Sequence, residues 1–337
     1  MPERTRPRLA VSYFGNRYPG HARQDMQALV GAGAETVVLV MSESDLRWNP
    51  GTIAELVQIA QGAGLEPWLT AWAIGGVFGG ETASYAVGEF PEACQRDNNG
   101  AHLPALCPRQ EPFRRVMRAW MDVAVASGVR TVQWDEPQLA LPFKAGAERY
   151  GCCCEVCQSA FRVQYGTDLP PVATAASERF FADLLTEIVK WLVAEARQRG
   201  LESAIVLLPD ENYDASHAAA MAALPGVSYF GSTPFTLRNG VASADIPNYL
   251  QDWAEQGNAA TQGTPARTYA WVQAFDVAAG QEDDIALAIT SLADAGVDLV
   301  AVWSYRACEA MSGLACENPD AAWDAVLTGF AAVRSRS

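Results

Sequence analysis

Short apolar runs, rich in β-branched and aromatic residues, recur eight times along the chain. They lie at 9–15, 35–42, 66–74, 129–136, 203–210, 227–235, 267–276 and 297–305. Apolar residues fill most of each run instead of alternating with polar ones, which is typical of strands that are covered on both faces. The pattern therefore predicts eight buried strands of a parallel sheet.

Segments with helical periodicity separate these strands. They lie at 22–33, 52–64, 112–128, 177–200, 217–225, 244–257, 282–296 and 319–333. Several of them end in glycine directly before the next strand, where a helix commonly stops. Eight alternations of strand and helix predict an α/β fold closed into a (β/α)8 TIM barrel, with residues 1–337 forming one barrel domain. A doubly wound open sheet is the alternative, but no glycine-rich phosphate-binding motif follows any strand.

The chain is longer than the ~250 residues of a minimal barrel, since it has 337. The surplus falls after the third predicted strand (75–110) and after the fourth (137–176). We expect enlarged loops at both places, with the insertions contained in 94–176. The stretch YGCCCEVCQ (150–158) lies in the second loop.

The composition excludes several classes of function. The formal net charge is −15 and the isoelectric point is about 4.6, so the surface repels phosphate backbones and nucleic-acid binding is not expected. No run approaches the ~20 apolar residues of a membrane span, and the N-terminus has no apolar signal core. These features predict a cytoplasmic protein without a membrane partner. With three histidines and two lysines, its chemistry would depend on carboxylates, Tyr, Ser or Cys.

Acidic and aromatic side chains gather behind the predicted strands. In a (β/α)8 barrel the active site lies at the C-terminal ends of the strands. The candidate catalytic residues are Glu136, Asp135, Asp276 and Asp210. The candidate substrate-binding residues are Trp72, Glu81, Trp134, Glu211, Trp271, Gln273, Trp303, Tyr305, Arg306 and Glu309.

This combination is typical of enzymes that cleave glycosidic bonds. Such cleavage needs a proton donor and a second carboxylate across the sugar ring, and flat aromatic rings offer a stacking surface to the sugar. A single acidic residue at a strand end is more often simply exposed to solvent. WDEP (134–137) stands out, because an adjacent Asp-Glu pair at a buried strand end is costly unless it has a use.

The cysteines Cys152, Cys154 and Cys157 form a C-x-C-x-x-C motif. With one more thiolate they would hold zinc tetrahedrally in a closed structural site. Cys94 and Cys107 are the two upstream candidates for the fourth ligand. We predict a structural zinc that joins the two enlarged loops, in preference to free thiols or disulfides, which are unusual in a cytoplasmic chain.

Three segments resemble, in the same order, glycoside hydrolase family 42 β-galactosidases. They are CPRQEPFRRVMRAW (107–120), VQWDEPQ (132–138) and CCCEVCQSAFRVQYG (152–166). The resemblance implies that Cys107, Cys152, Cys154 and Cys157 are the zinc ligands, with Glu136 as the acid/base and Asp135 in place of the family's asparagine. The family's nucleophile is a glutamate near the end of strand seven, usually followed by Gln, where this chain has Val272 before Gln273. The resemblance therefore implies a distant relative with a rearranged carboxylate pair.

The partner of Glu136 is left open by the sequence. In one pairing, Glu136 works with Asp276. In a second, Asp135 is the nucleophile and Asp210 or Glu211 is the acid. In a third, Glu136 is the acid and works with a distant base. A carboxylate separation of ~5–5.5 Å would predict retention and one of ~6.5–9.5 Å inversion.

We therefore predict a glycoside hydrolase or transglycosidase that acts on a small glycoside or oligosaccharide. The alternatives are a non-catalytic sugar-binding barrel, and a barrel lyase or isomerase, which would need a metal or a His or Lys base at the strand ends. The sugar, its anomer and the oligomeric state are not predicted by these patterns.

Overall fold

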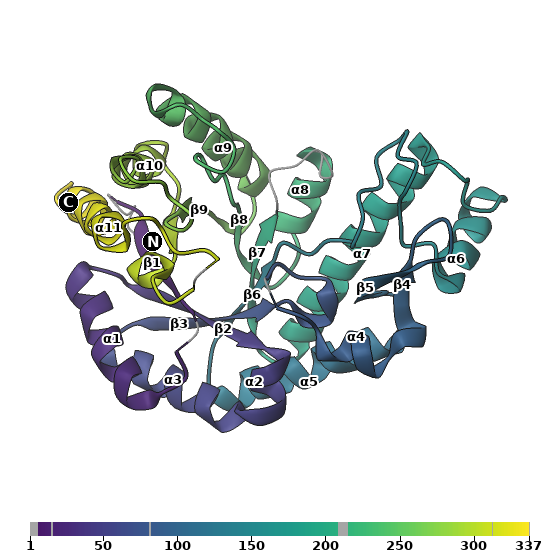
Figure 1. Cartoon of the computed structure of the whole chain (residues 1–337), viewed down its shortest axis with the longest axis horizontal. Coiled ribbons are helices and arrows are strands. Elements are labelled where there is room, and N and C mark those ends of the chain that lie inside the picture. The colour runs from purple at the N-terminus through teal and green to yellow at the C-terminus, as the bar shows by residue number, and fades with distance from the viewer. Residues whose placement is uncertain (1–5, 15, 81, 208–214, 312, 337) are drawn as a thin grey trace.

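The computed structural model describes residues 6–14, 16–80, 82–207, 215–311 and 313–336. Eight parallel strands close into a barrel, as predicted, in the order β1-β2-β3-β6-β7-β8-β9-β10 and back to β1 (Figure 1). The strands are β1 (Arg8–Tyr13), β2 (Thr36–Ser42), β3 (Glu66–Trp72), β6 (Thr131–Asp135), β7 (Glu202–Leu207), β8 (Val227–Ser232), β9 (Arg267–Gln273) and β10 (Leu299–Trp303).

Helices surround the barrel and cover the outer face of the sheet (Figure 1). They are α1 (Pro19–Ala32), α3 (Pro50–Ala63), α5 (Glu111–Ser127), α7 (Ala175–Gln198), α8 (Ala215–Ala222), α9 (Ile246–Thr261), α10 (Asp283–Asp294) and α11 (Pro319–Arg334). Three of them end at glycines that the sequence marked as stops, Gly33, Gly64 and Gly128, with φ of 95°, 92° and 80°. Glycine adopts this left-handed conformation without the steric cost that a Cβ brings. Among the described residues, no helix has both the length and the apolar character that crossing a bilayer requires.

The strands are covered on both faces, and this explains their continuous apolar sequence. Side chains such as Leu9 and Val11 pack against the helices, whereas Ala10 between them faces the barrel interior. The interior is filled by large rings: Trp68 lies 4.8 Å from Tyr229 and 6.0 Å from Tyr269, centroid to centroid. The barrel is therefore a packed core, and any ligand site must lie at its end.

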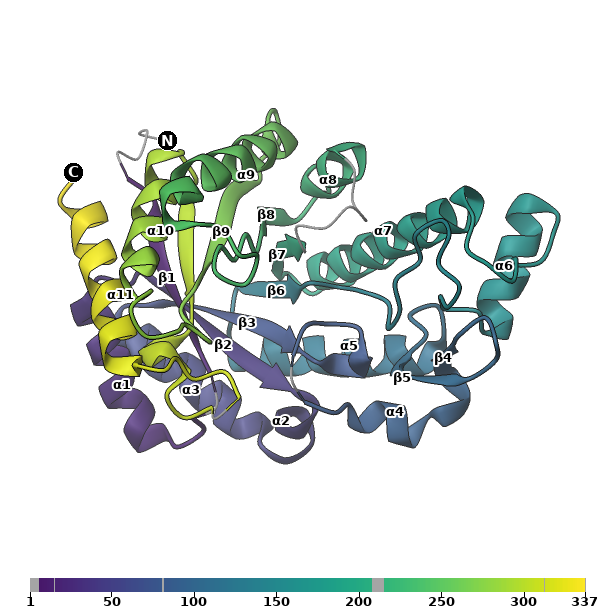
Figure 2. The same cartoon turned by 45° about the horizontal axis from the view of Figure 1, so that its top comes forward.

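Two long excursions extend from one side of the barrel, beside α7 (Figure 2). The first follows β3 and contains η1 (Ile74–Gly76), α4 (Tyr85–Glu89), η2 (Pro91–Ala93), and the hairpin of β4 (Cys94–Arg96) and β5 (His102–Leu106). The second follows β6 and ends with α6 (Glu155–Tyr165). We call residues 73–106 and 136–174 together the side lobe. Shorter elements follow other strands: α2 (Glu43–Trp48), η3 (Ser243–Asp245) and η4 (Tyr305–Cys308).

Candidate functional site

A cavity of about 60 Å³ lies at the C-terminal ends of the barrel strands. This is where (β/α)8 enzymes bind their substrates. Its wall is formed by Trp72, Gly79, Gly80, Asp135, Glu136, Thr233, Phe235, Arg238, Trp271, Phe275 and Trp303.

Asp135 and Glu136 both line the cavity although they are consecutive. Successive strand residues normally point to opposite faces, so the chain must turn between them. Glu136 does this with a φ of 46°, in the left-handed region that a residue with a side chain rarely adopts. Its own N–H donates to the Val206 carbonyl at 3.1 Å, which fixes the turn against β7. The predicted catalytic pair is therefore brought together at one place.

Hydrogen bonds hold each of the two carboxylates. The hydroxyl of Thr233, which follows β8, donates to Glu136 Oε1 at 2.7 Å. The amide Nε2 of Gln133 donates to Asp135 Oδ1 at 3.0 Å. The two groups also share a close neighbour in Gly79, where a Cβ would lie 3.2 Å from Glu136 Oε2 and 3.4 Å from Asp135 Oδ2. Only a residue without a side chain fits there without displacing a carboxylate.

Three of the four predicted tryptophans form an aromatic wall. The rings of Trp72 and Trp303 stack with centroids 4.9 Å apart and planes 8° apart. Trp271 meets Trp303 edge-on, at 6.2 Å and 71°. All three line the cavity beside the two carboxylates. The flat rings and the acidic groups thus occupy one site.

Trp134, the fourth predicted tryptophan, lies elsewhere. Its ring is fully buried between the barrel and the helices, next to Trp120 at a centroid distance of 5.6 Å. Its Nε1–H donates to Ser203 Oγ at 3.1 Å. Strand alternation explains this position, because Gln133 and Asp135 face inward and the residue between them must face outward.

The same alternation changes the interpretation of β9, which is the seventh strand of the barrel. Val272 packs in the outer layer, on the side of the helices, so a carboxylate at that position would not face the cavity. The neighbouring Trp271 belongs to the interior. Gln273 holds the loop after β8, because its Oε1 accepts from the Arg238 N–H at 2.9 Å and its Nε2 donates to the Phe275 carbonyl at 3.0 Å.

Several other predicted residues stand outside the cavity wall. Asp276 is exposed to solvent and is not part of that wall. Tyr305 donates from its hydroxyl to Asp25 Oδ1 at 3.0 Å. Arg306 pairs with Glu309 at 2.9 Å on the exposed surface. The predicted residues Glu81, Asp210 and Glu211 lie outside the described part of the chain.

Two further acidic residues, at the end of β2, have structural roles. Glu43 is buried, and its carboxylate accepts from the Gly75 N–H at 2.7 Å, the Ser84 hydroxyl at 2.7 Å and the Ala86 N–H at 2.8 Å. It thereby ties β2 to the first excursion and to the start of α4. Such a carboxylate has its acceptor sites occupied and is not available to a substrate.

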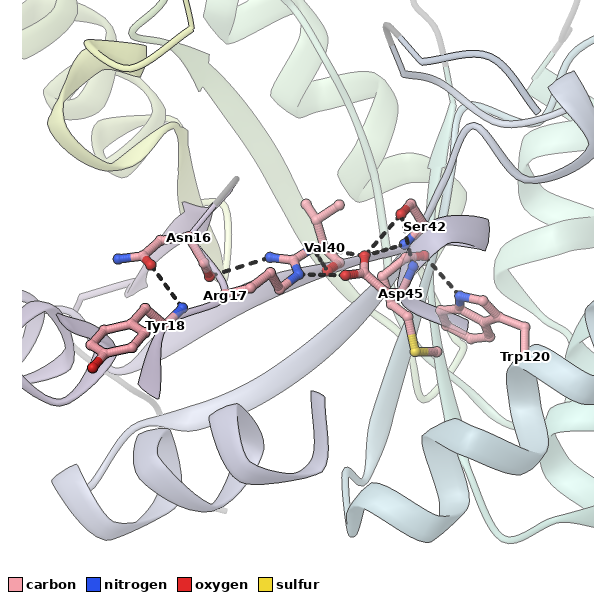
Figure 3. A network of polar contacts seen from close by, with 8 residues as sticks. Asn16, Arg17, Tyr18, Val40, Ser42, Asp45 and Trp120 are labelled. Carbon is pink, nitrogen blue, oxygen red and sulfur yellow. Dashed lines mark hydrogen bonds and ion pairs between the residues drawn. The ribbon is translucent and has the colours of Figure 1, made fainter. Parts of the chain in front are cut away.

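Asp45 is held in a network that Figure 3 shows in detail. Arg17 donates to its two carboxylate oxygens at 2.5 and 2.8 Å and also to the Val40 carbonyl at 2.8 Å. Ser42 donates to Asp45 Oδ2 from its hydroxyl, at 2.9 Å. Burial alone would raise the pKa of Asp45, but the hydrogen bonds and the charge of Arg17 outweigh it and lower the pKa below the ordinary value. Asp45 therefore stays ionised and structural.

Six residues of the cavity wall are absent from the sequence-based prediction: Gly79, Gly80, Thr233, Phe235, Arg238 and Phe275. Phe235 and Phe275 lie at the ends of the predicted strands 227–235 and 267–276, so the aromatic signal that indicated the tryptophans also applies to them. Thr233 and the two glycines carry no acidic or aromatic group that would indicate a site. Arg238 follows the predicted strand 227–235, and the bond from its N–H to Gln273 fixes its position.

The predicted cysteine cluster joins Cys107, which directly follows β5, to three cysteines of the side lobe. The sulfurs of Cys107, Cys152, Cys154 and Cys157 all lie within 4.8 Å of one another, and all four residues are buried. A tetrahedral zinc with Zn–S bonds of ~2.3 Å separates its sulfurs by ~3.8 Å, and Cys107 Sγ lies 3.7 Å from Cys157 Sγ. The four residues therefore fit a tetrahedral metal of that size.

Of the two upstream candidates, Cys107 and not Cys94 joins the cluster. The Cys94 thiol faces the carbonyls of Val87 and Phe90, at 3.6 and 3.7 Å. Within the cluster, hydrogen bonds from the other three thiols lower the pKa of Cys154. A low pKa at one member favours a thiolate, which is the form that binds metals.

The side lobe connects the cysteine cluster to the cavity. Cys153 donates its N–H to the Arg96 carbonyl at 2.6 Å, which joins the cysteine stretch to β4. The neighbouring Gln95 donates to the Leu106 carbonyl at 3.1 Å and accepts from the Ala140 N–H at 3.0 Å. The loop that begins with the two carboxylates is thus fixed to the same hairpin that precedes Cys107.

The fold is shared with several solved enzymes. The chain aligns over 98% of its length with 98% of the catalytic domain of a β-amylase from Paenibacillus polymyxa, at 10% identity and a TM-score of 0.67. It aligns over 96% of its length with 59% of a β-galactosidase from the psychrophilic Marinomonas ef1, at 15% identity and a TM-score of 0.67. It aligns over 98% of its length with 95% of an endo-1,4-β-mannanase from Rhizomucor miehei, at 11% identity and a TM-score of 0.62.

At these identities the likeness shows a common barrel fold. No family model and no curated protein sequence matches the chain.

Proposed function

We propose that the protein is a glycoside hydrolase, or a transglycosidase, with its active site in the cavity at the end of β6. The observation that carries the proposal is that Asp135 and Glu136 share one cavity with Trp72, Trp271 and Trp303. Carboxylate pairs perform glycosidic cleavage, and the tryptophan faces suit the apolar face of a sugar ring. The resemblance of 107–166 to glycoside hydrolase family 42 supports the same function.

In this proposal Glu136 is the proton donor to the leaving oxygen. A site with two neighbouring carboxylates favours a proton on one of them, because two charges so close repel each other. Thr233 orients Glu136 from the side of β8. Asp135 is the partner carboxylate among the described cavity residues, oriented by Gln133, and it would stabilise positive charge on the sugar or direct the attacking group.

We further propose that the cysteine cluster binds a structural zinc. Cys107, Cys152, Cys154 and Cys157 would supply four thiolates, so that no coordination position stays open for a substrate. The metal would fix the two excursions of the side lobe to each other. Elemental analysis of the purified protein should find about one zinc per chain, and a content well below one would contradict this assignment.

The experiment that tests the catalytic proposal is hydrolysis of a broad panel of α- and β-nitrophenyl glycosides. We expect the wild type to release nitrophenol from at least one glycoside. Glu136→Gln should lower that rate at least ~100-fold, as loss of a general acid does, while leaving the melting temperature within ~2 °C. Rates that persist in Glu136→Gln would contradict the role of Glu136.

The partner carboxylate is identified by two further variants. Asp135→Asn should lower the rate strongly if Asp135 is the partner, and Asp276→Asn should then have little effect because Asp276 is exposed outside the cavity wall. The opposite result would assign Asp276 to the reaction.

A second candidate function is a sugar-binding barrel without hydrolysis. It is favoured by the end of β9, which contributes Trp271 to the cavity wall but no carboxylate. Calorimetry separates the two functions: a sugar that binds wild type and Glu136→Gln equally, and that neither protein cleaves when presented as a glycoside, identifies the binding protein.

A further inference from the structure

Arg238 is the one cation among the described residues that line the cavity. It lies in the loop after β8, and its backbone N–H is fixed at 2.9 Å from Gln273 Oε1 at the end of β9. Its guanidinium forms no ion pair within 4 Å in the part of the chain that the structure describes. Arg306, which the sequence suggested as a ligand-binding cation, is instead paired with Glu309.

Trp271 lines the same cavity from β9 and is 3% exposed. Tyr269, two residues earlier on β9, lies in the packed interior of the barrel against Trp68 and Tyr229 and is not part of the cavity wall. Arg238 is therefore the group on this side of the cavity that could bind an anion.

The acidic residues and the arginine thus lie on different sides of the cavity. The carboxylates come from the end of β6, whereas Trp271 belongs to β9 and Arg238 is attached to it, with β7 and β8 between the two sides. Arg238 is an exposed residue, so water solvates its guanidinium when no ligand is bound, and a neutral sugar would not give it a charged partner. An arginine fork matches the geometry of a carboxylate, with two parallel hydrogen bonds.

We propose that the substrate sugar carries a carboxylate, as in a uronic acid, and that Arg238 binds that group. The inference builds on the proposed glycosidase function, and it specifies the class of substrate. The net charge of −15 repels anions at long range. An acidic sugar would therefore need a dedicated cation in the site, and Arg238 is placed to be that cation.

The experiment compares matched pairs of ligands by calorimetry, with Glu136→Gln as the background so that no ligand is cleaved. The probes are the α- and β-methyl glycosides of glucuronic and galacturonic acid, each against the corresponding glucoside or galactoside. We expect one uronide to bind at least ~10-fold more tightly than its neutral partner, which corresponds to ~1.4 kcal/mol. Adding Arg238→Gln should remove this preference, so that the uronide and its neutral partner bind within about twofold of each other.

Arg47→Gln is the matched control. Arg47 is an exposed arginine outside the cavity, paired with Glu89, so the variant changes the net charge equally and should keep the preference. A preference that survives Arg238→Gln but disappears in Arg306→Gln would overturn the assignment of Arg238.

The two proposals fail in different ways. If neutral glycosides bind as tightly as the uronides, or more tightly, the carboxylate inference is wrong and the glycosidase proposal stands. If uronides bind preferentially but the wild type cleaves no nitrophenyl uronide, the inference about the ligand holds and hydrolysis is wrong. If no glycoside of either class binds, both proposals are wrong.

Discussion

Replacing Glu43 by glutamine should weaken the fold without touching the chemistry. Glu43 Oε1 accepts from the Gly75 N–H and the Ser84 hydroxyl, and its Oε2 accepts from the Ala86 N–H. A glutamine keeps the shape and one oxygen. Its NH₂ group, however, would face the N–H of Ala86 or the two donors on the other side, so at least one donor would meet another donor.

The size of the effect follows from these contacts. The variant loses one hydrogen bond to a charged group, worth about 1.5–3 kcal/mol, and leaves the buried Ala86 N–H without an acceptor, at about 1–3 kcal/mol. Because the two terms overlap, we expect the free energy of unfolding to fall by about 2–4 kcal/mol. For 337 residues, an unfolding entropy of roughly 0.7 kcal/mol per degree converts this into a fall in melting temperature of about 3–6 °C.

Differential scanning calorimetry measures this shift, with Glu89→Gln as the control. Glu89 also belongs to this region, but it is half exposed in a surface ion pair with Arg47, so its replacement should cost less than about 1 kcal/mol. Hydrolysis per folded molecule should stay unchanged in Glu43→Gln. A large loss of activity with an unchanged melting temperature would refute the structural role and place Glu43 in the reaction.

Three further predictions concern the cavity, the acid stability and the cysteine cluster. Gly79→Ala should displace a carboxylate by a few tenths of an ångström and lower kcat/KM about three- to tenfold; full activity with an alanine there would show that Gly79 does not confine the pair. The lowered pKa of Asp45 means that its contribution to stability is complete above the ordinary value of 3.8 and is lost as the pH falls through the lowered pKa. The advantage of wild type over Asp45→Asn in urea unfolding should therefore shrink between pH 5 and pH 2, and a constant advantage would contradict the shift. Removing the proposed zinc with a chelator, or Cys157→Ser, should lower the melting temperature and the hydrolysis rate together. A chelator that removes metal without changing either would show that the cluster does not support the site.

The alternation of apolar strands and periodic helices was sufficient to predict the barrel. The strands are buried on both faces, so their sequences carry a continuous apolar signal, and glycines such as Gly33 and Gly64 stop the helices at positive φ. The short elements of the side lobe carry no such signal. The hairpin of β4 and β5 is also tied to distant residues, for example by the bond from Ala140 to Gln95.

The site was predicted less completely, because a site residue must lie at a strand end and must also point its side chain into the cavity. Trp134 and Val272 lie at the right strand ends but face the helices, and one residue of register decides this. Asp135 and Glu136 line the cavity together only because Glu136 has a positive φ, which no sequence pattern indicated. Arg238 is held at the cavity by a bond to Gln273, a contact between the loop after β8 and the end of β9.

The location of a bound sugar tests the proposed active site most directly. A crystal structure of Glu136→Gln with an uncleaved glycoside should show the sugar ring against Trp72 or Trp303. Its glycosidic oxygen should lie within ~3.2 Å of the side chain of residue 136, the reach of a proton donor. A glycoside bound elsewhere on the barrel, or bound in the cavity with its glycosidic oxygen directed away from residue 136, would contradict the proposed active site.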